Sequence, residues 1–124
     1  MRYLLLVYID QTLLDALPPA AFDAEMRHCL EHADAMKADG SLIGFEQLEA
    51  PASARTVRVR AGRAAVLDGP FTETKEMLAG FNLVEAESLE AAVQMAQAFP
   101  WTRYGAIEVR PVRDVAAVRA RVGA

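Results

Sequence analysis

The chain has 124 residues, of which 53% are hydrophobic, and a formal net charge of −4. This length is close to the commonest size of a single domain and can bury a sizeable core, and no linker or repeat divides it, so we expect one domain over residues 1–124. The basic residues are scattered and outnumbered by acidic ones, which argues against direct nucleic-acid binding.

Residues 3–9 form an apolar run that ends at Asp10. The run is too short to cross a membrane and has no small-residue cleavage site, so it indicates a strand buried on both faces. Cys29 is the only cysteine, which excludes an intrachain disulfide and a multi-cysteine metal site. Together these features predict a cytoplasmic protein that does not associate with a membrane.

The first helix is predicted to begin at Pro18 and Pro19 and to end at Gly40, because proline suits the first helical turn and glycine the position after the last. Apolar side chains recur on it at steps of three and four: Phe22, Met26, Cys29, Ala33 and Met36. Cys29 belongs to this stripe, and we expect it to be a small buried apolar residue.

His28 and His32 have the i, i+4 spacing of a metal-binding helix face, and Glu25 precedes them by one turn. Both histidines lie to one side of the apolar stripe, whereas a metal site needs convergent ligands and exclusion of solvent. We therefore expect a surface pair that binds no metal.

Residues 42–48 predict a second strand, and residues 56–60 alternate with period two before turning back through 61–63 into 64–67, as in a hairpin. Residues 80–86 predict a further strand. Residues 89–99 predict a second helix, capped by Ser88 and stopped by Pro100. Its expected inner face comprises Leu89, Ala92, Val93 and Ala96. Residues 104–112 predict the last strand, and residues 114–122 a short terminal helix.

The resulting order is β-α-β, an inserted hairpin, and β-α-β, which is the ferredoxin-like α+β plan: an antiparallel sheet with both helices on one face. The other face of the sheet remains uncovered. Since an exposed apolar face marks an interface, we expect a homodimer whose two sheets pair face to face.

The segment Asp68-Gly69-Pro70-Phe71-Thr72-Glu73-Thr74-Lys75-Glu76, followed by Gly80-Phe81, resembles the signature of the YCII-related, DGPF-type family. The flanking residues 3–5, 56–60 and 108–112 agree with the same family. The resemblance implies a dimeric α+β barrel, an unsettled activity, and a connection to extracytoplasmic-function sigma factors in bacteria. YCII proteins proper are thought to use a His–Asp pair; neither His28 nor His32 falls at the matching position, which argues against such a pair here.

Read physically, this motif is a turn with polar side chains. Asp68 can accept hydrogen bonds from the following backbone N–H groups, and Phe71 can anchor the loop by burying its ring. Thr72 or Thr74 can cap a short helical turn whose N–H groups suit an anion, and Lys75 adds a positive charge. The alternative is a structural turn with solvated charges.

The last strand carries a second candidate, since Glu108 and Arg110 are two residues apart and project from the same sheet face. If the neighbouring apolar side chains face the helices, this pair points between the two sheets and can bind a small acid or orient a proton-transfer group. Tyr8 can point into the same space. The alternatives are an intersubunit ion pair without a chemical role and a core tyrosine.

Two functions remain open. The first is a small-molecule-binding dimer or enzyme with an acid–base site between the sheets, in which Asp68 is the catalytic base and a small anionic ligand is held by Arg110 and Lys75. Its ligand-binding residues would be Tyr8, Phe71, Lys75, Glu108 and Arg110. The second is a non-catalytic interaction or regulatory protein associated with a sigma-factor system. No sequence feature indicates a cofactor.

Overall fold

The main sheet of the protein has four antiparallel strands in the order β2-β5-β1-β6 in a computed structural model that describes residues 1–124. Its strands are β1 (Arg2–Ile9), β2 (Leu42–Gln47), β5 (Met77–Glu85) and β6 (Gly105–Pro111). The two central strands, β1 and β5, come from different β-α-β units, and each pairs with one outer strand. This arrangement confirms the ferredoxin-like α+β fold expected from the sequence.

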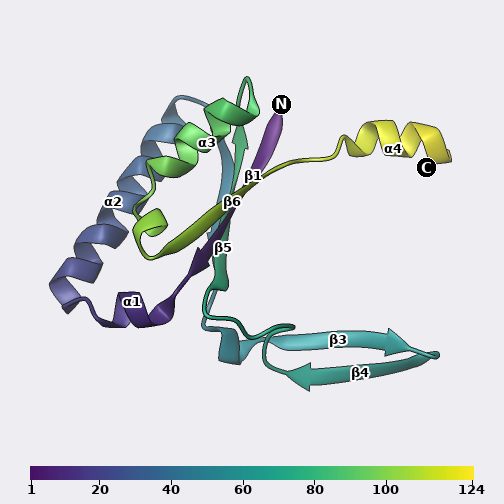
Figure 1. Cartoon of the computed structure of the whole chain (residues 1–124). Coiled ribbons are helices and arrows are strands. Elements are labelled where there is room, and N and C mark those ends of the chain that lie inside the picture. Colours follow the sequence, from purple (N-terminus) through teal and green to yellow (C-terminus); the bar gives the residue numbers. More distant parts are fainter.

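The helices cover one face of this sheet and leave the other open (Figure 1). They are α1 (Gln11–Asp15), α2 (Pro19–Ala38) and α3 (Leu89–Gln97). Two short 3₁₀ turns also occur: η1 (Pro51–Ser53) follows β2, and η2 (Pro100–Arg103) connects α3 to β6. Alternate residues of β1 point toward the helices, since Tyr3, Leu5, Val7 and Ile9 are all buried. They pack in one core cluster with the buried stripe of α2: Cys29, Ala33 and Met36.

The ends of the helices follow local chemistry. Helix α2 begins at Pro19, and Gly40 beyond its end has φ +84°, the left-handed conformation that glycine adopts without strain. The Ser88 hydroxyl accepts a hydrogen bond from the N–H of Ala91 (3.1 Å) and so caps α3. The sequence did not predict α1, which is capped by Asp10.

The predicted inner face of α3 was half right. Ala92 and Ala96 are buried, but Leu89 and Val93 are 43% and 37% exposed. Two alanines one turn apart make a narrow contact stripe against the sheet. Val93 lies about 100° around the helix from Ala92, so its side chain points away from this contact. Leu89 is the first residue of α3, at the end of the helix.

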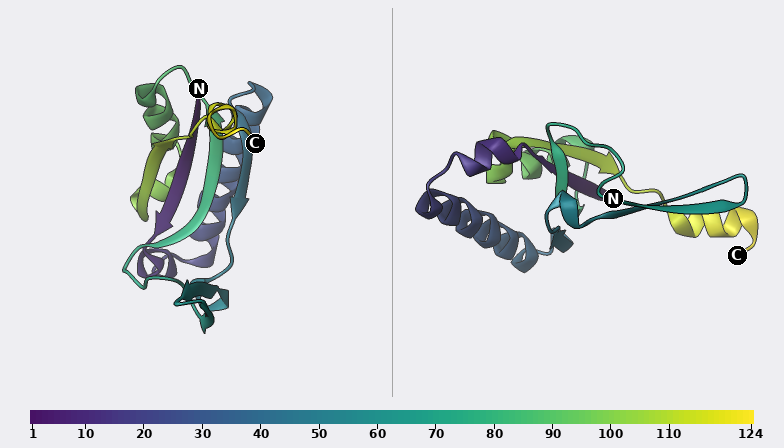
Figure 2. Two further views of the ribbon diagram at one scale, coloured as in Figure 1. Left: turned by 90° about the vertical axis from the view of Figure 1, so that its right-hand side faces the viewer. Right: turned by 90° about the horizontal axis from the view of Figure 1, so that it is seen from below.

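Two elements extend from the main body as arms. The hairpin of β3 (Arg55–Arg60) and β4 (Arg63–Asp68) is a separate two-stranded sheet, and α4 (Val115–Val122) forms the C-terminal arm. Figure 2 shows that both project away from the helical layer, on the side of the open sheet face. The hairpin turns at Ala61 and Gly62, which both have positive φ, as a two-residue hairpin turn requires.

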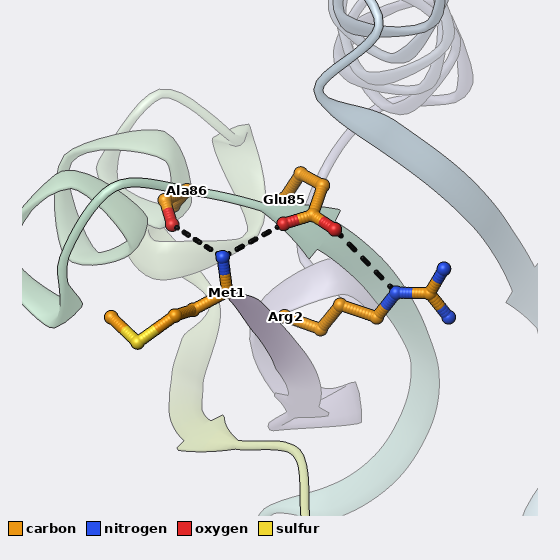
Figure 3. A network of polar contacts seen from close by, with 4 residues as sticks. All are labelled: Met1, Arg2, Glu85 and Ala86. Atoms are coloured by element: carbon orange, nitrogen blue, oxygen red, sulfur yellow. Dashed lines mark hydrogen bonds and ion pairs between the residues drawn. The ribbon is translucent and has the colours of Figure 1, made fainter. Parts of the chain in front are cut away.

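The start of β1 is tied to the end of β5 by polar contacts (Figure 3). The α-amino group of Met1 donates to Glu85 Oε2 (2.9 Å) and to the carbonyl oxygen of Ala86 (3.3 Å), and Arg2 Nε lies 3.6 Å from Glu85 Oε1. The hydrogen bond from this amino group lowers the pKa of the Glu85 carboxyl. These contacts support the register of the two central strands.

No helix combines the length and the apolar character that crossing a bilayer requires.

Candidate functional site

A buried carboxylate stands at the end of the first central strand. Asp10 is 4% exposed, follows β1 directly and is the N-cap of α1. Its Oδ1 accepts hydrogen bonds from the backbone N–H (3.1 Å) and the hydroxyl (2.6 Å) of Thr12, while Lys75 Nζ lies 3.6 Å from its Oδ2. The sequence Asp-x-Thr thus fixes one oxygen, and the second oxygen faces a lysine from a distant segment.

The charged form of Asp10 is favoured in this setting. The hydrogen bond from the Thr12 hydroxyl is the largest influence and lowers the pKa of the Asp10 carboxyl; the ammonium group of Lys75 acts in the same direction, and burial opposes both. Lys75 itself is largely exposed at the surface. Asp10 is therefore an ionised, oriented acceptor beside an exposed cation.

Two adjoining hollows lie at this end of the sheet, and Asp10 lines the outer one. The inner one, a cavity of about 200 Å³ between the sheet and α2, is lined by 16 residues, of which 11 are hydrophobic. The outer one, of about 450 Å³, is lined by Asp10, Thr12 and Lys75 among others. The hollows share Ile9, Gln11, Leu48 and Ala79 in their linings. An ionic group thus stands next to an apolar cavity, the combination that small-molecule sites commonly show.

The inner cavity also contains polar groups. Trp101 Nε1 donates a hydrogen bond to Cys29 Sγ (3.2 Å), and both residues line the cavity. Burial raises the pKa of the Cys29 thiol, so this sulfur is kept protonated and is not an activated nucleophile. Cys29 is buried within the stripe of α2, as predicted.

Of the site residues predicted from the sequence, Lys75 alone lies in these hollows. Its position follows from the loop between β4 and β5, which returns the chain to the end of β1, where Met77 pairs with Ile9. No helical turn forms in this loop; the Thr74 hydroxyl instead donates to the carbonyl oxygen of Glu76 (2.6 Å). The expected helical anion site at Thr72 or Thr74 is therefore absent.

Asp68 and Phe71 lie at the base of the hairpin arm. The Asp68 side chain is 87% exposed and its Oδ1 lies 3.1 Å from Arg55 Nε, which joins the first residue of β3 to the last of β4. The Asp68 carboxylate was expected to accept hydrogen bonds from the backbone N–H groups that follow it, but it pairs with Arg55 instead. Phe71 is 69% exposed and lies under the guanidinium of Arg58 (4.6 Å), so its ring is not buried within the chain as expected.

Tyr8, Glu108 and Arg110 lie on the open face of the sheet. Glu108 pairs with Leu6 across the strands and Arg110 with Leu4, whereas the buried residues of β1 face the helices. Arg110 Nε lies 3.6 Å from Glu108 Oε2. The structure therefore brings these two charges together on the face of the sheet that the helices leave open, outside both hollows.

The predicted surface pair of histidines is correct for His28 only. His28 is exposed, whereas the ring of His32 packs edge-on against Phe99 (4.6 Å) and its Nε2 is buried without a hydrogen-bond partner. The reason is that Phe99, which follows α3, packs against the side of α2 that carries His32, next to the apolar stripe. The chain contains no cluster of three or more His, Cys, Asp or Glu side chains arranged to hold a metal ion.

Two residues of the site were missed by sequence reasoning. The apolar run marks Asp10 only as the end of a strand, although an acid followed two residues later by threonine is an N-cap signal. Asn82, in the apolar strand β5, is 6% exposed and lines the inner cavity. A single amide within a buried strand was the available signal for it.

Comparison with known proteins agrees with this architecture. The model of the YCII-related domain family matches residues 1–116. An uncharacterised protein of Rhizobium meliloti (strain 1021) is 35% identical over 116 residues, which cover 90% of this chain and 92% of that protein. Among solved structures, the chain resembles 5-chloro-2-hydroxyhydroquinone dehydrochlorinase (TftG) from Burkholderia phenoliruptrix AC1100 in complex with 2,5-dihydroxybenzoquinone. The TM-score is 0.52 at 19% identity, over 91% of this chain and 94% of that one. The family match and the relative together show that this chain belongs to the YCII-related domain family.

Proposed function

We propose that this protein binds a small organic molecule of about one ring in the inner cavity and that Asp10, with Lys75, carries out proton transfer at its mouth. The observation that carries the proposal is a nearly buried, ionised carboxylate with a lysine partner beside an apolar cavity of about 200 Å³. A cavity of roughly 150 Å³ already holds benzene, so this one has room for a ring with a substituent.

The chemistry follows from the two charged groups. Asp10 would accept a proton from an acidic O–H or C–H of the ligand, and the ammonium of Lys75 would stabilise the anion that remains. Removal of water by the bound ligand strengthens both interactions. The solved structure with the same fold bears the name of a dehydrochlorinase and holds a dihydroxybenzoquinone. That ligand is a single oxygenated ring, which supports the same size class for this protein.

We further propose a homodimer formed through the open sheet face. Half-buried Leu4, Leu6, Phe81 and Leu83 lie on this face, and the hairpin exposes Val57, Val59 and Val66. An isolated hairpin with an apolar side is marginal in water, so a second copy that covers it would stabilise the arm.

The distribution of charge also favours a second copy as the partner. Residues 55–68 carry four arginines and one aspartate, a net charge of +3, and residues 110–124 also carry +3. Because the whole chain has a net charge of −4, the remaining residues together have a net charge of −10. Basic arms on one copy complement the acidic body of another. In such a dimer Tyr8, Glu108 and Arg110 would lie between the sheets, and Asp68 and Phe71 would lie near the partner.

The experiment is a screen of single-ring phenols, quinones and enols for binding and turnover by the wild-type protein, followed by the same assays on Asp10→Asn. This variant keeps the shape of the side chain and one acceptor oxygen for Thr12. We expect it to retain binding and to lose turnover by about two to four orders of magnitude.

The matched control is Asp15→Asn, which alters an exposed carboxylate on α1 outside both hollows. It should react as the wild type does. Equal turnover by Asp10→Asn and the wild type would remove Asp10 from the chemistry. If no ring compound binds, the protein is better explained as a non-catalytic regulatory dimer, the alternative function.

A further inference from the structure

The inner cavity contains one nearly buried amide that the chain itself leaves without a partner. Asn82 is 6% exposed, lies on β5 opposite Leu5 of β1 and Phe45 of β2, and faces the helices. It lines the cavity, yet its amide forms no hydrogen bond within the chain, whereas two other polar side chains of the lining are paired: Gln47 Nε2 with Met26 Sδ (3.3 Å) and Trp101 Nε1 with Cys29 Sγ (3.2 Å).

A nearly buried amide without a partner is unfavourable unless something else satisfies it. The polar atoms of Asn82 stay accessible from the cavity, since the only fully buried polar side-chain atom without a partner is His32 Nε2. A buried water would need two to four polar partners, and this largely apolar lining offers few that are still free. An organic molecule with one polar group and an apolar body fits the same space better.

We propose that Asn82 recognises the ligand, and that the ligand is an uncharged ring compound with a hydroxyl or amide group that both donates to and accepts from the Asn82 side chain. An amide offers a donor and an acceptor side by side, which such a group complements. The ligand is uncharged at this end because the lining is largely apolar and an unpaired charge there would be strongly disfavoured; the one carboxylate of the lining, Glu46, is exposed.

Asn82 and Asp10 serve different ends of the site. Asn82 lies opposite Leu5, and Asp10 follows Leu5 by five residues, about 16 Å along the strand. A single ring is shorter than this span, so a ring held by Asn82 must move to the mouth before Asp10 can take a proton from it. The inference rests on the proposed function in that both use the same cavity. However, recognition by Asn82 requires no chemistry at Asp10.

The test compares phenol with toluene, which has a methyl group in place of the hydroxyl. Trp101 is the only tryptophan and lines the cavity, so quenching of its emission reports binding. We expect the ratio of the toluene to the phenol dissociation constant to fall about tenfold in Asn82→Leu, the effect of one hydrogen bond. Gln94→Leu removes an exposed amide from α3 outside the cavity and should keep the wild-type ratio.

Asn82→Leu should melt at or above the wild-type temperature, because it removes a buried amide that has no partner. Should that variant fail to fold, the side-chain amide resonances of Asn82 in the wild-type protein provide a second measurement, and they should shift with phenol more than with toluene. An unchanged ratio in Asn82→Leu, equal shifts with both probes, or no binding of either probe would overturn the proposal.

Asp10→Asn separates this inference from the proposed function. If Asp10→Asn reacts normally while Asn82→Leu loses the preference for phenol, ligand recognition stands and proton transfer by Asp10 fails. If Asp10→Asn loses turnover while Asn82→Leu keeps the wild-type ratio, the proposed function stands and the role of Asn82 fails.

Discussion

Lys75 Nζ lies 3.6 Å from Asp10 Oδ2, so the loop after the hairpin and the end of the first strand meet at one carboxylate. Sixty-five positions separate the two residues in the sequence. Lys75 belongs to segment 68–76, which resembles the family signature, whereas Asp10 lies outside that segment. The contact therefore joins the motif to a residue at the end of β1.

This contact predicts how stability depends on pH. The folded structure lowers the pKa of Asp10, mainly through the Thr12 hydroxyl, so the stabilisation is complete above the unfolded value of about 3.9 and is lost as the pH falls through the folded pKa. We expect the melting temperature of Asp10→Asn to fall less than that of the wild type between about pH 7 and pH 3. Asp15→Asn is the control and should match the wild type; an equal loss in all three proteins would contradict the assignment.

The close approach of β6 to β1 predicts intolerance at Gly105. A Cβ atom added there would lie 1.9 Å from the Tyr8 carbonyl oxygen, so Gly105→Ala must separate the two strands. We expect a loss of about 3 kcal/mol or more in urea denaturation. At Gly44 an added Cβ meets no atom within 4 Å, and Gly44→Ala should change stability by no more than about 0.5 kcal/mol. Similar losses in both variants would show that the strand spacing at Gly105 is not limiting.

The buried edge of His32 predicts a stabilising substitution. Its Nε2 has no hydrogen-bond partner, and its ring packs against Phe99. His32→Leu keeps an apolar contact without the unpaired nitrogen and should raise the free energy of unfolding by about 1 kcal/mol. His28→Leu, at an exposed position one turn earlier, should be neutral within about 0.5 kcal/mol. A loss of stability in His32→Leu would show that Nε2 has a partner, such as an ordered water.

The open face and the basic arms predict a homodimer that weakens with salt. Sedimentation should show a dimer at a protein concentration on the order of tens of micromolar. The dimer should dissociate more as the ionic strength rises, because the arms and the body carry opposite charge. Val57 and Val66 pair across the hairpin, and changing both to aspartate should weaken the dimer more than tenfold. Leu30→Asp on the outer side of α2 serves as the control. A wild-type monomer at this concentration would contradict the dimer.

Local sequence determined most of the elements of this protein. Proline before α2 and glycine after it, serine before α3, and the apolar residues of β1 each act on their own neighbours, so their effects can be read without knowledge of the fold. The alternation of apolar and polar residues likewise predicted that Glu108 and Arg110 share a sheet face and stand apart from the helix-facing side chains.

Tertiary structure alone decided which of these residues meet. Pairing of β5 with β1 returned Lys75 to Asp10, and the same pairing buried Asn82 against α2. It also left the hairpin outside the main sheet, with Asp68 at the base of an arm rather than in a cavity. Contacts between distant segments depend on how whole surfaces pack, because one strand can place a side chain in a site only after its neighbours have fixed its register. The sequence predicted the parts of the fold, and the packing of its two β-α-β units placed the candidate site at the end of β1.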